Sequence, residues 1–224
     1  MDPIRIVEVK EAVLADNDAA ARSNKERMKA QNTVLINLMG SPGAGKTSTL
    51  LQLIARMKDT LRIGVMEADV DSDVDAQTIG DAGVRVIQLH TAGLCHMDAD
   101  MTARALERFG TDGLDLIFLE NIGNLVCPAE FDVGADLRLM ILSVPEGDDK
   151  PLKYPLMFTV SDVLLVNKVD TAPIFDFDME QLKQHVRALN PEMKIFPVSA
   201  KTGEGFEAVA SYLESRIRER RNGR

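Results

Sequence analysis

The sequence contains a glycine-rich stretch, GSPGAGKT, at residues 40–47, directly after the apolar run VLINLM and before a helical pattern. This is the P-loop pattern in the strand, loop and helix context that it requires, which an ordinary glycine-rich turn would not share. The glycines allow backbone N–H groups to curl around nucleotide phosphates, Lys46 can reach the β and γ oxygens, and the Thr47 hydroxyl can bind Mg²⁺. The residues expected to contact the nucleotide here are Gly40, Ser41, Pro42, Gly43, Ala44, Gly45, Lys46, Thr47 and Ser48.

Two later motifs predict which base is bound. NKVD at residues 167–170 and SAK at residues 199–201 each stand at the end of an apolar run. A carboxylate at Asp170 can accept hydrogen bonds from guanine N1–H and from the exocyclic amine, two donors that adenine does not offer at those positions. We therefore expect GTP or GDP as the ligand. The residues expected around the base are Asn167, Lys168, Asp170, Ser199, Ala200 and Lys201.

A third motif predicts a switch that senses the γ-phosphate. The run LDLIFLE at residues 114–120 continues as ENIG, a glutamate variant of the DxxG switch motif. Glu120 is expected to contact Mg²⁺ directly or through water, and the amide of Gly123 is expected to face the γ-phosphate.

An acidic run, DVDSDVD, occupies residues 69–75. Asp69, at the end of the run VMEAD, is expected to be the carboxylate of the first switch. Asp71, Asp73 and Asp75 are further candidates, for which a solvated and charged helix start is the alternative. The catalytic set expected from these motifs is Lys46, Thr47, Asp69, Asp75 and Glu120, with Thr47, Asp69 and Glu120 around Mg²⁺.

A Cys-His pair stands in the stretch GLCHMD at residues 93–98, and Cys127 follows Glu120 by seven positions. Cys95 and His96 follow one apolar run and Cys127 follows another, so both loops should emerge at the same edge of a parallel sheet. Two thiols and an imidazole suit Zn²⁺, Ni²⁺ or Cu⁺ and leave a coordination position open for exchange or for a second subunit. Because Cys127 lies in the predicted switch loop, metal geometry and nucleotide state should be coupled. Packing roles for the thiols are the alternative.

The elements that must position these groups are short apolar runs separated mostly by helical patterns. Such runs predict an α/β fold, a three-layer P-loop NTPase with a mostly parallel central sheet flanked by helices. The runs occupy residues 34–39, 62–67, 84–89, 114–120, 137–144, 162–168 and 194–199. We expect one domain over residues 1–224, with residues 1–31 as a helical N-terminal extension of one or two helices. Residues 216–224, RIRERRNGR, are expected to form a frayed and solvated helix end.

The composition limits the classes of protein that fit. The chain has 224 residues, 45% of them hydrophobic, and no apolar run near the about 18 residues that a membrane span requires. No secretory signal is visible, so a cytoplasmic location is expected. Two cysteines are too few for a disulfide framework. A net charge of −9 and a pI of about 4.9 argue against non-specific binding to nucleic acid or to an anionic membrane.

Taken together, the motifs resemble one family, the HypB GTPases that help to insert nickel into [NiFe]-hydrogenases, within the SIMIBI branch of P-loop proteins. The resemblance covers nearly the whole chain. It is carried by GSPGAGKT, GLCHMDADM, FLENIGNLVCPAEFDVG, SVPEGDDKPLKYP, NKVD and SAKTGEG. ENIGNLVCPAEFD and EGDDKPLKYP are much more specific than the nucleotide motifs, which any G protein could share.

The resemblance implies a slow GTPase that dimerises when GTP is bound and carries a metal site at or beside the dimer interface. It implies that Cys95, His96 and Cys127 bind Ni²⁺ or Zn²⁺, and that the partners are the nickel and zinc protein HypA and the hydrogenase large-subunit precursor. Lys153, with Lys150 beside it, is expected to touch nucleotide in the same or the partner subunit. Some family members carry a Cys-rich or His-rich N-terminal segment, but no Cys or His precedes His90 here, so tight nickel storage is not expected.

The function predicted from the sequence is GTP-gated metal transfer. A related SIMIBI maturation GTPase, serving urease or a cobalamin enzyme, is one alternative, although the urease type usually places its Cys and His together in one short motif. A plain regulatory G protein with structural cysteines and a scaffold that dimerises on metal alone are the others. The residues do not distinguish Ni²⁺ from Zn²⁺, because both accept sulfur and nitrogen ligands.

Overall fold

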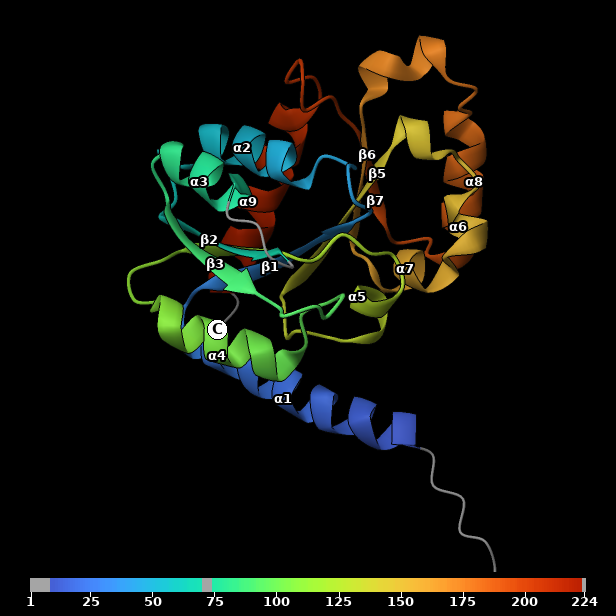
Figure 1. The fold of residues 1–224 in the computed structure, drawn as a ribbon. Coiled ribbons are helices and arrows are strands. Elements are labelled where there is room, and N and C mark those ends of the chain that lie inside the picture. The colour runs from blue at the N-terminus through green and yellow to red at the C-terminus, as the bar shows by residue number, and fades with distance from the viewer. Residues whose placement is uncertain (1–8, 70–73, 223–224) are drawn as a thin grey trace, which may run out of the picture.

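The computed structural model describes residues 9–69 and 74–222, so Asp71 and Asp73 lie outside the described residues. Seven parallel strands form one sheet in the order β3-β2-β4-β1-β5-β6-β7 (Figure 1). The strands are β1 Val34–Gly40, β2 Ile63–Asp69, β3 Arg85–His90, β4 Leu116–Glu120, β5 Leu137–Ser143, β6 Val163–Asn167 and β7 Lys194–Pro197. All seven predicted strands are confirmed, and the sheet is parallel throughout its described strands.

Helices cover both faces of this sheet, which confirms the three-layer prediction. The helices are α1 Val9–Gln31, α2 Lys46–Met57, α3 Val74–Asp81, α4 Ala99–Phe109, α5 Cys127–Glu130, α6 Lys150–Lys153, α7 Pro155–Val160, α8 Met179–Leu189 and α9 Phe206–Asn222, with 3₁₀ turns η1 Val144–Glu146 and η2 Val169–Ile174. Alternate side chains of the inner strands point to opposite faces of the sheet. Ile36 and Leu38 of β1 pack with α2 and α9, whereas Leu35 packs on the face of α1 and α4 and Met39 packs with α7 and α8.

The described part of the N-terminal segment forms one helix, α1, which lies along α4 on the face opposite α2 and α9 (Figure 1). Met28 of α1 is fully buried among the apolar side chains of this face. Asn24 donates its amide to the carbonyls of Ala99 and Val133, at 2.8 and 3.1 Å. None of the described helices is both long enough and apolar enough to cross a membrane.

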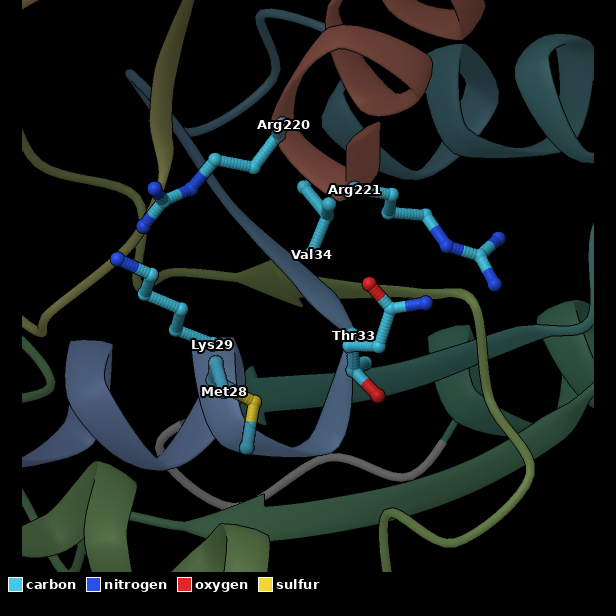
Figure 2. A pocket seen from close by; sticks show the side chains of 7 residues that line it. Met28, Lys29, Thr33, Val34, Arg220 and Arg221 are labelled. Carbon is cyan, nitrogen blue, oxygen red and sulfur yellow. The ribbon is translucent and has the colours of Figure 1, made fainter. Parts of the chain in front are cut away.

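The predicted C-terminal helix end is confirmed as solvated, since Arg216, Arg218, Glu219 and Arg220 are exposed, but its described part is not frayed, because α9 continues to Asn222. Arg220 Nε lies 2.5 Å from Oδ1 of Asp136, and Arg221 lies 2.8 Å from Oδ1 of Asp115. In Figure 2 the two arginines leave the end of α9 in opposite directions, on either side of Val34. Both carboxylates are nearly buried, and they hold the helix end against the starts of β4 and β5, the two strands that flank β1.

The order of the strands creates the place for a ligand. From β1, the chain proceeds to one side through β2, β3 and β4 and to the other side through β5, β6 and β7, so the order reverses at β1. In parallel sheets, the crevice beyond the carboxyl ends of the strands at such a point is the usual ligand site. The P-loop, Cys-His, switch, NKVD and SAK motifs follow β1, β3, β4, β6 and β7, and the acidic run begins at the end of β2, so all of them start at this edge of the sheet.

Candidate nucleotide and metal sites

The P-loop follows β1 and turns directly into α2. Gly45 precedes the first residue of α2 with φ 97°, in the left-handed region that favours glycine, and a Cβ there would collide with the side-chain amide of Asn167. Asn167 donates that amide to the Ala44 carbonyl at 2.9 Å. A Cβ on Gly123 would lie 2.9 Å from the nitrogen and Cγ of Pro42, so the predicted switch loop lies directly against the P-loop.

The two residues predicted to hold Mg²⁺ at the start of α2 and the end of β4 are in contact. Thr47 donates its hydroxyl to Oε1 of Glu120 at 3.0 Å. Burial of Glu120 raises its pKa to about 7, although the charge of Lys46 and the Thr47 hydrogen bond oppose the rise. Its other oxygen, Oε2, is buried without a hydrogen-bond partner among the described residues.

A residue that sequence reasoning missed, Glu67, completes this cluster. Glu67 of β2 pairs in register with Glu120 of β4 and is only 2% exposed. Burial is the main cause that raises its pKa to about 8, and the neighbouring charges of Glu120, Asp69 and Asp75 add to it. Carboxylate oxygens of Glu67, Asp75 and Glu120 all lie within 4.8 Å of one another.

Asp69 was predicted to be the carboxylate of this cluster, and the structure places it at the last position of β2. The Asp69 charge raises the pKa of both Glu67 and Glu120, so Asp69 lies near the cluster, while the three close carboxylates are those of Glu67, Asp75 and Glu120. The signal that could have identified Glu67 is the period of two in β2. Ile63, Val65 and Glu67 point to the same face, and the strand pairing sets Glu67 beside Glu120.

The cluster fits a magnesium ion. Within the described part of the chain, Glu67 and Glu120 each bury one carboxylate oxygen without a hydrogen-bond partner, which is costly unless a cation compensates. Carboxylate and hydroxyl oxygens are the ligands that Mg²⁺ prefers, and the Thr47 hydroxyl lies beside Glu120.

The predicted base site forms a cavity of about 270 Å³ beside the P-loop. Lys168 donates its ammonium to the Gly43 carbonyl at 2.7 Å, and Asn167 accepts the Ala200 N–H at 3.0 Å. Ser199 donates its hydroxyl to Oδ1 of Asp170 at 2.6 Å. The cavity is lined by Gly45, Ser48, Asn167, Lys168, Asp170, Thr171, Ala200 and Lys201. The structure therefore brings together the P-loop, NKVD and SAK segments that the sequence assigned to one nucleotide.

The predicted metal ligands also meet. The sulfur atoms of Cys95 and Cys127 are 3.2 Å apart, and the Cys95 sulfur lies 3.8 Å from Nδ1 of His96. Each residue offers a ligand atom within 4.8 Å of the other two. The imidazole of His96 stacks on Phe131 with 4.2 Å between ring centroids, which fixes the ring beside the thiols.

The pKa shifts of Cys127 and His96 favour reversible binding of a metal ion at this trio. The hydrogen bond from Cys95 is the first cause that raises the pKa of the Cys127 thiol, followed by burial and the Cys95 charge. Burial lowers the pKa of His96, against the charges of Asp98 and Glu130, and so favours the neutral imidazole that binds metals. Both thiols must lose protons when a metal binds, so protons compete with the metal.

Lys153 is the predicted nucleotide residue that the structure does not tie to this site. It lies on α6, and its ammonium pairs with Asp149 at 2.5 Å. The Lys150 ammonium lies over the Tyr154 ring, 5.3 Å from its centroid. Among the described residues, no hydrogen bond or ion pair joins Lys153 to the P-loop, so a contact with nucleotide stays a prediction.

A parallel sheet with a P-loop after its central strand, and buried carboxylates near that loop on the next two strands to one side, β4 and β2, defines a P-loop nucleoside triphosphatase. The family model CobW/HypB/UreG, nucleotide-binding domain, matches residues 6–197. The chain is 42% identical to the hydrogenase maturation factor HypB of Rhizobium leguminosarum bv. viciae over 214 residues, which cover 96% of this chain and 72% of that protein. It therefore belongs to the HypB family.

Two solved structures of this family have the same fold. HypB from Helicobacter pylori in complex with nickel is 38% identical with a TM-score of 0.84, and the match covers 91% of this chain and 96% of that one. HypB from Archaeoglobus fulgidus is 36% identical, also with a TM-score of 0.84, and the match covers 91% and 99% of the two chains. The family resemblance and the fold expected from the sequence are confirmed.

Proposed function

We propose that this protein is a GTP-hydrolysing metallochaperone that binds nickel or zinc and delivers nickel for [NiFe]-hydrogenase maturation, with the metal site and dimerisation gated by GTP. The observation that carries the proposal is the convergence of three soft ligand atoms, two from the loop after β3 and one from Cys127, which follows Gly123 on the loop after β4. Cys127 is four residues from Gly123, which lies against the P-loop. The nickel complex of the Helicobacter pylori relative supports nickel as the cargo.

In the proposed hydrolysis, water attacks the γ-phosphate in line with the leaving oxygen. The P-loop amides and Lys46 stabilise the negative charge that develops on the phosphate oxygens. Thr47, Glu67 and Glu120 would hold Mg²⁺, with Asp69 and Asp75 beside them, and the bound ion would supply further charge neutralisation. Asp170 selects guanine. The family resemblance implies a slow intrinsic rate.

The metal switch follows from the covalent path between Gly123 and Cys127. When the γ-phosphate is lost, the Gly123 amide loses its contact with the phosphate oxygens, and the loop after β4 relaxes. Cys127 then shifts relative to Cys95 and His96, which belong to a different loop. As a result, the binding of the nickel ion is weakened or the ion is exposed to solvent. Nickel thus leaves when its ligands separate, while the nucleotide stays bound as GDP.

The surface around the trio supports a protein partner on this face. Leu94 is 51% exposed and Val126 is 49% exposed, and these residues directly precede Cys95 and Cys127. Exposed apolar side chains that gather around a site favour association. A GTP-dependent homodimer would bring two trios together across a two-fold axis. A HypA-type nickel and zinc protein and the hydrogenase large-subunit precursor are the other proposed partners, and the expected cytoplasmic location stays a prediction.

Maturation of urease is a second candidate, because one relative carries both roles in its name. The hydrogenase/urease maturation factor HypB of Helicobacter pylori is 37% identical over 217 residues, which cover 95% of this chain and 89% of that protein. A single nickel-transfer mechanism would serve either target enzyme.

A Ni²⁺ titration of the purified protein tests the proposal, run once with GDP and once with a non-hydrolysable GTP analogue, both with Mg²⁺. We expect a clear difference in affinity or stoichiometry between the two states, which the Cys127→Ala variant loses. Equal binding in both states would mean that the trio is a static structural or dimer site. Unchanged metal content in a Cys95→Ser, Cys127→Ser variant would instead favour a regulatory G protein with packing cysteines.

A further inference from the structure

Asn124 lies between the predicted γ-phosphate sensor, Gly123, and the metal ligand Cys127, and it bonds to its own loop and to two other segments. Its backbone N–H donates to the Gly40 carbonyl at the start of the P-loop, at 3.1 Å. Its side-chain oxygen accepts the Val126 N–H at 2.8 Å, and its side-chain amide donates to the Cys95 carbonyl at 3.3 Å. One residue thus joins the nucleotide loop to both halves of the metal trio.

A second asparagine on the same loop, Asn121, has a different setting. It is fully buried, and its amide donates to Asn37 of β1 at 3.1 Å. Its oxygen accepts the N–H groups of Met97 at 3.1 Å and Ile122 at 2.9 Å. Because Asn121 is bound to the central strand, it fixes the base of the Cys95 loop to the sheet. Asn124 is only half-buried, so water can replace its hydrogen bonds when the loop moves.

The covalent connection from Gly123 to Cys127 explains how a movement of Gly123 would shift Cys127. It does not explain how that movement would shift Cys95 and His96. Those two ligands stand on the loop after β3, about 30 positions earlier in the sequence. The hydrogen bond from Asn124 to the Cys95 carbonyl bridges that separation beside the ligands themselves. If residue 123 moves, the Asn124 side chain must either carry the Cys95 loop with it or release it.

We propose that Asn124 is the positioning residue that couples the nucleotide state to the metal trio, through its simultaneous hydrogen bonds to Gly40 and Cys95. This inference rests on the proposed function and adds the element that transmits the signal. Without the Asn124 side chain, the metal site still has its three ligands and the nucleotide site still has its motifs. What is lost is the dependence of one site on the other.

Two variants separate the bonds of this side chain. Asn124→Asp has the same shape and keeps an oxygen for the Val126 N–H, but it has no amide hydrogen to give to the Cys95 carbonyl. Asn124→Ala loses both bonds. Asn190→Ala is a matched control, because the Asn190 amide also binds backbone carbonyls, those of Phe158, Thr159 and Ser161, but on the far side of β6 from the trio.

The measurement is the ratio of the Ni²⁺ dissociation constants obtained with GDP and with a non-hydrolysable GTP analogue. We expect a ratio of at least about fivefold in the wild type and in Asn190→Ala, and a ratio within about twofold of one in both Asn124 variants. The charge that Asn124→Asp adds acts on Cys127, which the proposed switch moves, so Asn124→Ala, which adds no charge, is the variant whose ratio decides the question. Since linkage is reciprocal, Ni²⁺ should change the affinity for a fluorescent GTP analogue by the same factor in the wild type and not in the variants.

Three results would overturn the inference, each in a distinguishable way. If both Asn124 variants keep the wild-type ratio, gating stands and Asn124 does not transmit it. If the wild-type ratio is itself one, the gating in the proposed function fails and there is nothing to transmit. If both variants bind GDP normally but bind no nickel in either state, Asn124 builds the metal site rather than coupling it.

Discussion

At the scale of single residues, the most informative observation is a pair of buried carboxylates that face each other. Glu67 and Glu120 are 2% and 3% exposed, and each has an oxygen without a partner among the described residues. A protein keeps such a pair only if something compensates the charge, and a divalent cation beside the P-loop does so. We therefore propose that Glu67 joins Thr47 and Glu120 in the predicted magnesium site, although its sequence context gave no motif.

The substitution Glu67→Gln tests this role. It keeps the shape of the side chain but removes one negative charge from the cation site, so we expect the Mg²⁺ concentration needed for half-maximal GTP hydrolysis to rise about 10-fold to 100-fold. Direct binding of Mn²⁺, followed by electron paramagnetic resonance in the presence of GDP, should weaken to a similar degree. Asp69→Asn is the comparison variant. A larger loss in Asp69→Asn with an unchanged Glu67→Gln would return the role to Asp69, as the sequence predicted.

At the scale of elements, the strands could be predicted because both faces of a parallel sheet are covered, so each inner strand appears as a continuous apolar run. The P-loop and the base motifs could be assigned because strand ends at one edge must lie near one another. Glu67 was missed because its neighbour Glu120 lies on another strand and only the register sets them side by side. The anchoring of the end of α9 was missed for the same reason, since its partners Asp136 and Asp115 stand about 85 and 105 positions earlier.

The end of α9 makes a measurable contribution to stability. Arg220→Ala leaves the nearly buried carboxylate of Asp136 with the Leu35 N–H as its remaining described partner, so we expect a loss of about 1 kcal/mol in the free energy of unfolding. Urea denaturation measures this change. Arg218→Ala on the same helix is the matched control, because its ion pair with Glu214 is exposed and 3.9 Å long, and it should stay within about 0.5 kcal/mol of the wild type. Equal values for the two variants would show that the helix end contributes nothing through Asp136.

At the scale of the whole molecule, the residues at the carboxyl edge of the sheet, where nucleotide is expected to bind, lower the free energy of unfolding. The P-loop requires glycine in a left-handed conformation at Gly43 and Gly45, and the cation site requires buried like charges. The rest of the sheet, with β1, β4 and β6 completely buried, offsets these costs. Stability should therefore depend on whether nucleotide and cation are bound.

This dependence has a definite sign with pH. The pKa of Glu67 is about 8 and that of Glu120 about 7 in the folded protein, each raised from an ordinary value of 4.5 mainly by burial. A carboxyl group with a raised pKa favours the folded state while it stays protonated. Its contribution is fully present below pH 4.5 and is lost as pH rises through 7 and 8.

We therefore expect the melting temperature of the protein without nucleotide or Mg²⁺ to fall between pH 5.5 and pH 8.5 by at least about 2 to 4 °C, the change that 1 kcal/mol makes in a domain of this size. Glu67→Gln should remove most of this fall, because a neutral amide cannot ionise. Adding GDP with Mg²⁺ should also flatten the profile of the wild type, because the cation stabilises the ionised carboxylates that pH alone makes costly. A wild-type profile as flat as that of Glu67→Gln, measured by differential scanning calorimetry in both conditions, would mean that the two carboxylates are not coupled to folding and that the cation site is more hydrated than its burial implies.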